Sequence, residues 1–326
     1  MNLETTYLGL KLKNPLIISS SGLTRSLENI IKFEKLGASA IVIKSLFEEQ
    51  IKQKINSVIS LDSENTYSQA DDYIRAYTED HEVGEYLEYI SLAKRNINIP
   101  VIASINCISA TEWTSFTKKI EDAGADAIEL NIFVLPSDPD KNAENYEKIY
   151  FDIVENVRKH TKLPVAIKLS WYFSGLANMI RKLSWTGING VVLFNRFYSP
   201  DINIHQLDIK PSDIYSTPDE IYNSLRWVAI LSDIVECDIS ASTGIHDGEG
   251  AIKQLLAGAK TVQICSTLYK HGFQRISEIL SDIEKWMKEK NYNSIDEFRG
   301  KMSMRKIQNP AVLNRVQFMK HYAGIE

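Results

Sequence analysis

The sequence has few cysteines and no long apolar run, and each absence excludes a class of protein. Its three cysteines, Cys107, Cys237 and Cys265, are far apart in the chain. A sparse, odd set does not build a disulfide framework and fits a reducing cytoplasm. No CxxC or HExxH pattern indicates a metal site. No stretch of about 18 apolar residues predicts a membrane span, and the opening residues lack a signal-peptide pattern.

The chain also has no excess of basic residues. Its net charge is −5 and its pI is about 5.8, so nucleic acid is not the expected partner. Apolar residues make up 44 % of the 326 positions, which is enough for a large core. This length allows two average domains or one barrel.

Eight short runs rich in Ile and Val recur along the chain, with helical stretches between them. They are residues 15–19, 40–44, 100–105, 127–131, 164–169, 190–195, 238–242 and 261–265. Most are continuously apolar rather than alternating, as expected of parallel strands covered on both faces. Eight βα units predict an α/β fold, a closed (β/α)8 TIM barrel. An open doubly wound sheet is the alternative.

The segments between these runs have helical periodicity. In residues 142–160, Tyr146, Ile149, Tyr150, Ile153 and Val157 fall on one face, and residues 273–290 repeat the pattern. A glycine that ends a helix precedes several strands, as in "KLGASA" and "DAGADA". The first residues, "LETTYLGLKLKN", predict a hairpin that closes the bottom of the barrel.

Two polar stretches are longer than a minimal barrel needs. Residues 46–85 follow the second strand, and residues 196–217 follow the sixth. Both leave the ends of strands where barrel enzymes build their sites, so we expect insertions that cover the site. We predict a single barrel domain over residues 1–300. Residues 301–326 are expected to form a helical extension that packs on the barrel or on a dimer partner.

Polar side chains stand at the ends of four predicted strands. Lys44 and Lys168 end the second and fifth strands, and Asn131 and Asn195 end the fourth and sixth. A lysine at such a position is costly unless its ammonium meets an anion or extends to the rim. In a barrel all four converge on one mouth, where they can hydrogen-bond a flat heterocycle.

Small residues follow the last two strands. They are Ser242, Thr243 and Gly244 after one strand, and Cys265, Ser266 and Thr267 after the next. Hydroxyls and backbone N–H groups at these positions form the usual phosphate site of a barrel, although small residues also serve tight turns. Together the two loops predict a phosphorylated cofactor or substrate. His246 lies in the first loop and either contacts a ligand or has a surface or capping role.

With these residues in place, the chain resembles the dihydroorotate dehydrogenase family, especially its soluble class 1 branch. The resemblance is carried by "AIVIKS", "SINCISATEW", "IELN", "AIKLSWYF" and "STGIHDGEGAIKQLLAGAKTVQICSTLYKHG". The long block is similar to the family's flavin-phosphate segment in order and spacing. The resemblance implies an FMN-dependent oxidoreductase that acts on a CH–CH bond of dihydroorotate or a related planar or carboxylated compound. It also implies pyrimidine biosynthesis, a cytoplasmic location and a homodimer.

The resemblance also implies roles for individual residues. Those for the cofactor are Ser21, Gly22, Lys44, Ser45, Asn131, Lys168, Phe194, Thr243, Gly244, Cys265 and Ser266. Those for the substrate are Lys44, Asn131 and Asn195. Lys168 would stabilise the negative charge of the reduced flavin. The family usually has glycine where Thr243 and Cys265 stand, and phosphate contacts through backbone N–H groups tolerate such a change.

The loop after Asn131 departs from the family pattern. That pattern is Asn, apolar, Ser, Cys or Ser, Pro, Asn, and its Cys or Ser takes a proton from the substrate carbon. Here "NIFVLPSD" supplies Phe133 and Val134, and neither Val134 nor Leu135 accepts a proton. Ser137 is the nearest hydroxyl and the candidate base. The family's Asn-bearing substrate stretch has no counterpart in residues 56–70, so the flavin site is expected to be kept and the dihydroorotate site changed.

Three other hypotheses stay open beside an FMN oxidoreductase with a changed substrate. One is a true dihydroorotate dehydrogenase whose base loop is rearranged. Another is a lyase or aldolase that forms a Schiff base on Lys44 or Lys168, because a barrel does not fix function. The last is a flavin-binding protein without catalysis, whose apolar loop contacts a partner.

Overall fold

The computed structural model describes residues 1–47, 68–107 and 114–315, and eight parallel strands within these ranges close into a barrel. Around the barrel they are β3 (Leu16–Ile18), β4 (Ala40–Val42), β6 (Val101–Cys107), β7 (Ala127–Ile132), β8 (Val165–Leu169), β9 (Gly190–Leu193), β12 (Asp238–Ser242) and β13 (Thr261–Ile264). β13 pairs with β3, and β4 pairs with β6, so the ring is complete. All eight predicted strands are confirmed within two residues at either end, and closure excludes the open sheet.

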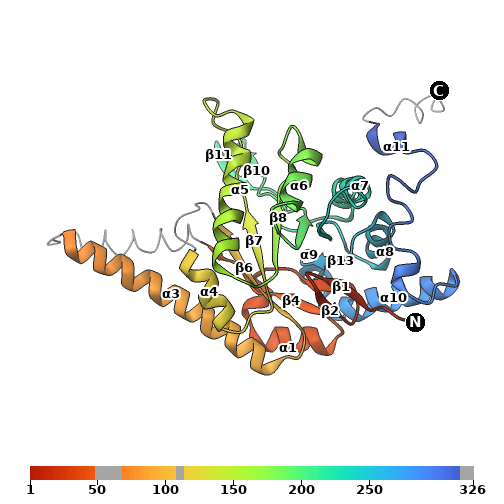
Figure 1. Ribbon diagram of the computed structural model, residues 1–326, viewed down its shortest axis with the longest axis horizontal. Helices are drawn as coiled ribbons and strands as arrows, with labels where there is room; N and C mark the ends of the chain where they lie inside the picture. Colours follow the sequence, from red (N-terminus) through yellow and green to blue (C-terminus); the bar gives the residue numbers. More distant parts are fainter. Residues whose placement is uncertain (48–67, 108–113, 316–326) are drawn as a thin grey trace.

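Helices follow the strands and surround the barrel (Figure 1). They are α1 (Leu27–Lys35), α3 (Ser68–Asn96), α4 (Thr114–Asp122), α5 (Ala143–His160), α6 (Leu176–Ser184), α7 (Ile221–Leu231), α8 (Gly248–Ala257), α9 (Ser266–His271) and α10 (Arg275–Glu289). Three 3-10 turns, η1 (Gly22–Arg25), η2 (Pro218–Glu220) and η3 (Ile295–Glu297), connect them. The predicted helical faces are largely buried: α5 buries Tyr150, Ile153 and Val157. Burial of these apolar faces against the strands is the main source of the barrel's stability.

The N-terminal hairpin closes the floor of the barrel, as predicted. Its strands β1 (Thr5–Tyr7) and β2 (Leu10–Leu12) pair antiparallel. Tyr7, Leu8 and Leu12 are buried in one cluster with side chains from the barrel strands. The backbone N–H of Leu8 also donates to the Asp238 carboxylate over 2.9 Å. The bottom of the barrel is therefore filled, and the opposite end is left for a site.

The insertion after the second barrel strand is shorter than residues 46–85. Residues 46 and 47 form the short strand β5 (Leu46–Phe47), and α3 begins at Ser68. Residues 68–85 are thus the first half of the barrel helix α3, which extends beyond the barrel wall (Figure 1). A helix with a polar sequence and a polar loop have similar composition, which explains the error. The predictions for residues 48–67, including most of the stretch 56–70 without a substrate asparagine, lie outside the described residues.

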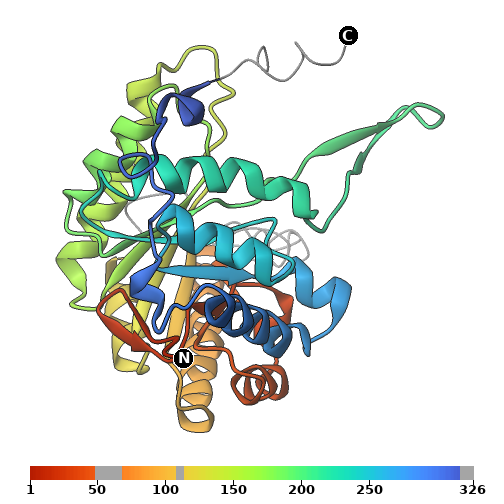
Figure 2. The ribbon, with the colours of Figure 1, turned by 90° about the vertical axis from the view of Figure 1, so that its right-hand side faces the viewer.

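The insertion after the sixth strand is a hairpin that projects from the body of the molecule. Its strands β10 (Pro200–Asn203) and β11 (Asp208–Pro211) pair antiparallel, and Figure 2 shows them reaching away from the barrel. Its apolar side chains lack cover: Ile202, Ile204, Leu207 and Ile209 are 66 to 86 % exposed. The predicted insertion is confirmed, and its exposed side chains are available for contact.

The C-terminal segment is less helical than predicted where the structure describes it. Residues 301–310 form turns, and the helix α11 (Ala311–Asn314) has four residues. Met304 is bound to the barrel domain through its backbone N–H, which donates to the Ala229 carbonyl over 2.8 Å. No helix within the described ranges is long and apolar enough to cross a membrane.

Candidate active site

A cavity of about 320 Å³ opens at the carboxyl ends of the barrel strands. Its wall combines strand ends with the insertion after β9. The strand-end residues are Ser19, Ser20, Lys168, Asn195, Ser242, Thr243, Gly244, Gln263, Cys265 and Ser266. The predicted cofactor residues of β8, β12 and β13 therefore line one cavity.

The turn after β12 has a backbone that is unusual for its sequence. Thr243 and Gly244 both have positive φ angles, 73° and 77°. The hydroxyl of Thr243 donates to the Phe194 carbonyl over 3.0 Å, which stabilises a conformation that a side chain disfavours. At Gly244, an added Cβ would lie 2.2 Å from the backbone nitrogen of Ile221. The turn consequently tolerates Thr243 but requires glycine at 244.

The loop after β3 meets the end of β13. Burial raises the pKa of the Cys265 thiol, and a hydrogen bond with the Ser21 side chain opposes that rise. A Cβ on Gly22 would lie 3.0 Å from the Tyr269 hydroxyl of α9. Ser21 and Gly22, which are far from Cys265 in the sequence, thus lie beside the small-residue end of the cavity, although neither lines it.

His246 lies behind this end of the cavity rather than at the surface. It is 3 % exposed, and its Nε2 lies 3.0 Å from the Ser216 hydroxyl. Burial and the nearby Lys270 and His271 lower its pKa, so the ring is neutral near pH 7. The Ser216 backbone N–H donates to the hydroxyl of Ser266 over 3.1 Å. His246 therefore supports the cavity wall through Ser216.

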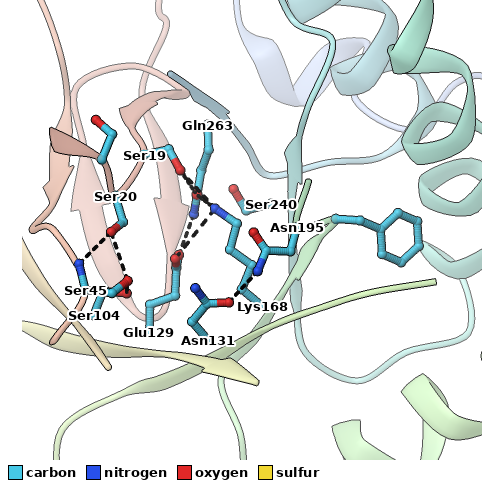
Figure 3. Close-up of polar contacts among 12 residues, drawn as sticks. Ser19, Ser20, Ser45, Ser104, Glu129, Asn131, Lys168, Asn195, Ser240 and Gln263 are labelled. Carbon is cyan, nitrogen blue, oxygen red and sulfur yellow. Dashed lines mark hydrogen bonds and ion pairs between the residues drawn. The ribbon is translucent and has the colours of Figure 1, made fainter. Parts of the chain in front are cut away.

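A polar network runs from the cavity into the barrel (Figure 3). Lys168 is 6 % exposed, and its ammonium donates to Ser19 Oγ over 2.9 Å and to Gln263 Oε1 over 3.3 Å. Glu129 lies deeper: its Oε2 accepts from Gln263 Nε2 over 2.7 Å, and its Oε1 is 3.8 Å from Lys168 Nζ. Sequence reasoning found Lys168 but missed Ser19, Glu129 and Gln263. A glutamate within "AIEL" and a glutamine within "TVQI" interrupt otherwise apolar runs. Because every second residue of a barrel strand points into the barrel, these two residues were candidates for its interior.

A second polar chain joins β4 to β6. Ser45 donates from its backbone N–H to Ser20 Oγ over 2.8 Å, and its hydroxyl lies 2.7 Å from that of Ser104. Figure 3 shows this chain beside the Lys168 network. Lys44, the neighbour of Ser45, lines a different cavity of about 280 Å³, together with Tyr86 and Tyr89. The structure therefore separates Lys44 from the cavity that Lys168 lines, while Ser45 connects the two.

The two predicted asparagines are in direct contact. Asn195 Nδ2 donates to Asn131 Oδ1 over 2.6 Å, which joins the end of β7 to the loop after β9 (Figure 3). Lys168 on β8 faces the cavity between these strands, and Asn195 lines it. Within the part of the chain that the structure describes, Asn131 keeps a free N–H donor and Asn195 keeps a free carbonyl acceptor.

The first residues of the loop after Asn131 are apolar, and two of them pack against other apolar side chains. The ring of Phe133 packs on Phe197, with centroids 4.0 Å apart. Val134 packs against the core, whereas Leu135 is 54 % exposed. Ser137 is exposed and lines neither cavity described above. Of the predicted flavin residues, Lys168, Thr243, Gly244, Cys265 and Ser266 line one cavity, whereas Lys44 and Ser45 line the other and the candidate base Ser137 lines neither.

Comparison with known proteins defines the class to which this barrel and site belong. The sequence profile of the family described as dihydroorotate dehydrogenase matches residues 2–287. The chain belongs to the dihydroorotate dehydrogenase family.

Curated relatives cover almost the whole chain. The catalytic subunit of dihydroorotate dehydrogenase B (NAD(+)) from Thermoplasma volcanium is 27 % identical, over 92 % of this chain and 98 % of its own. Its counterpart from Pyrococcus abyssi is 29 % identical, over 91 % and 98 %. Dihydropyrimidine dehydrogenase (NADP(+)) of the chloroplast from Arabidopsis thaliana is 23 % identical, over 92 % and 76 %. The predicted resemblance to this family is confirmed.

Proposed function

We propose that this protein is an FMN-dependent oxidoreductase that transfers a hydride between a CH–CH bond of a small planar compound and the flavin. The observation that carries this proposal is one buried cation, Lys168, in the wall of a cavity whose other end is lined by small residues. The named relatives oxidise or reduce dihydropyrimidine rings, which supports the same reaction type here. The three scattered cysteines support a cytoplasmic location.

The residues around the cavity fit FMN. Thr243, Gly244, Cys265 and Ser266 would hold the phosphate, because their small side chains leave the backbone accessible. Lys168 would lie at the ring edge, and Ser20 with its partner Ser45 would line the ring on the β3 side. FMN when bound supplies hydride acceptance, and the protein contributes orientation and charge.

The amide pair of Asn131 and Asn195 would hold the substrate. Its free N–H and free carbonyl match a ring that carries an adjacent C=O and N–H. Because each amide is fixed by the other, the substrate meets an oriented donor and acceptor, which is the condition for efficient positioning.

The proton that leaves the substrate carbon needs an acceptor. Val134 stands where the family has its base, and Ser137 is the one hydroxyl in residues 132–142. We propose Ser137 for this role. Because Ser137 is exposed and lines neither cavity, the proposal requires the loop after β7 to shift toward the bound substrate. If Ser137 accepts the proton, the variant Ser137→Ala should lose turnover and keep its FMN affinity.

The experiment is anaerobic reduction of the purified protein saturated with FMN. Dihydroorotate, dihydrouracil and related dihydro-heterocycles are added separately, and the flavin absorbance near its visible maximum is followed. Bleaching by one of these compounds supports the proposal, and bleaching by dihydroorotate would identify the protein as a true dihydroorotate dehydrogenase with a rearranged base loop. If FMN binds and no compound bleaches it, a flavin-binding protein without catalysis becomes the better account.

The alternative of a Schiff-base lyase is less well supported by the geometry. An ammonium held by Ser19, Gln263 and the Glu129 carboxylate is a poor nucleophile. Trapping with borohydride and candidate carbonyl compounds tests the lyase directly. A mass adduct on Lys44 or Lys168 would favour it.

We also propose a homodimer that forms through the hairpin β10–β11. Leu207 is 86 % exposed, and Ile202, Ile204 and Ile209 surround it with apolar surface. An apolar patch of this kind on a projecting hairpin is typical of an interface rather than of a solvated loop.

A further inference from the structure

The interior of the barrel contains a carboxylate that no part of the proposed site needs for binding. Glu129 is 1 % exposed and does not line the cavity. Its Oε1 has no hydrogen-bond partner among the residues that the structure describes. Burying a carboxylate costs free energy unless a nearby cation and hydrogen bonds replace its lost hydration. The contacts of Glu129 should therefore explain how its charge is stabilised.

The cation that stabilises the Glu129 carboxylate is Lys168, the residue that faces the cavity. Lys168 Nζ lies 3.8 Å from Glu129 Oε1. Gln263 bridges the pair, because its Nε2 donates to Glu129 while its Oε1 accepts from Lys168. Since Gln263 can satisfy both partners in one amide orientation, the three side chains form a single fixed unit.

The three side chains extend from the cavity wall into the interior of the barrel. The ammonium of Lys168 is in the cavity wall, and the carboxylate of Glu129 is behind it (Figure 3). Glu129 therefore cannot touch a ligand, but its charge opposes the charge that Lys168 presents. Burial, and after it the charge of Glu129, raise the pKa of the Tyr7 hydroxyl in the barrel floor and keep it neutral.

We propose that Glu129 is a positioning residue that sets the electron affinity of the bound flavin through Lys168. This inference rests on the proposed FMN site. The carboxylate holds Lys168 in place and offsets part of its positive charge. It thereby weakens the stabilisation of added negative charge in the cavity and lowers the reduction potential of the flavin.

The test uses the purified full chain saturated with FMN, and its readout is sulfite affinity, because sulfite adds to flavin and places negative charge on the ring. Glu129→Gln should bind sulfite about tenfold more tightly, because the Lys168 ammonium is no longer held by the carboxylate and can move toward the negative charge on the ring. Glu129→Asp keeps the charge and should lie between Glu129→Gln and the wild type. Ser240→Ala is the matched control, since Ser240 is buried in the barrel and bonds Thr261 rather than Lys168.

A double-variant cycle tests whether Glu129 acts through Lys168. In the Lys168→Met background, Glu129→Gln should change sulfite affinity by less than about twofold. A wild type that binds no FMN would refute the proposed function itself. A wild type that binds FMN, with Glu129→Gln binding sulfite no more tightly, would overturn the role of Glu129 alone. An equal gain with and without Lys168 would also overturn it.

Discussion

The side-chain amide of Asn195 donates to Asn131 Oδ1 over 2.6 Å, so β7 is joined directly to the loop after β9, across the intervening strand β8. The pair fixes the orientation of the two groups that we assign to the substrate. Under the proposed function, substrate recognition and flavin binding would depend on different parts of one barrel mouth.

Asn195→Ala should reduce turnover more than it reduces flavin binding. Loss of the hydrogen bond frees Asn131 and removes one acceptor, at a cost of about 1–3 kcal/mol in the transition state. We expect a fall in kcat/KM of about ten- to a hundredfold, measured with the substrate that bleaches the flavin. FMN affinity should stay within about threefold. Asn203→Ala, in the hairpin, is the matched control and should change neither value.

The Lys168–Glu129 pair should contribute to the free energy of unfolding as well as to the sulfite affinity of the bound flavin. Lys168→Met leaves a buried carboxylate without its cation and should lower the free energy of unfolding by about 3 kcal/mol. The double variant Glu129→Gln/Lys168→Met removes both charges and should recover much of this loss. Urea denaturation of the four proteins measures it. Equal stability of the single and double variants would contradict the pairing.

Gly244→Ala should damage the phosphate end of the site. The new Cβ meets the backbone of Ile221 and the residue has positive φ, so we expect a loss of about 3 kcal/mol or more together with loss of FMN affinity. Gly272→Ala has nearly the same φ, 79°, but open space around its Cβ. It should cost about 1 kcal/mol and leave FMN affinity unchanged. Thermal melts and FMN titration of both variants separate crowding from backbone strain.

Protonation of His246 should destabilise the folded protein at acidic pH. Its pKa is lowered in the folded state by burial, Lys270 and His271, against the opposing carboxylates of Asp247 and Glu220. The unfolded chain then binds a proton more readily, so stability is full above the unfolded pKa of about 6.5 and falls as the pH drops below it. His246→Gln should reduce the fall in Tm between about pH 7.5 and about pH 5.5. The exposed His205→Gln should leave it as in the wild type.

Leu207→Asp should convert the proposed dimer to a monomer. A carboxylate at the most exposed apolar position of the hairpin opposes burial of that surface. Sedimentation velocity measures the mass, and Met302→Asp, on a turn of the C-terminal segment, is the control that should stay dimeric. A wild type that sediments as a monomer at high concentration would rule out the hairpin interface.

The barrel itself could be predicted from sequence because most of its strands are short, continuous apolar runs. "AIVIK" and "GVVLFN" are covered on both faces in the structure, so no polar position interrupts them. Residues 68–85 were placed in a loop because helices with a polar sequence and polar loops share a composition. Their helical state depends on α3 continuing toward Asn96, where it packs on the barrel.

The site could be predicted where a strand end carried a distinctive residue. Lys168, Asn131, Asn195 and the turn at Thr243 were found in this way. The Glu129–Gln263 bridge was missed because the residues come from strands far apart in sequence, and their contact exists only once the barrel closes. The separation of Lys44 from the main cavity was missed for the same reason, since strand order alone does not give side-chain direction.

Flavin titration of the wild-type protein is the measurement that tests the central claim most directly. FMN should bind stoichiometrically with quenched fluorescence, and riboflavin, which lacks the phosphate, should bind at least about a hundredfold more weakly, a difference of about 2.7 kcal/mol. This preference is expected because the small-residue end of the cavity is assigned to the phosphate. Absence of FMN binding, or equal affinity for riboflavin, would contradict the account.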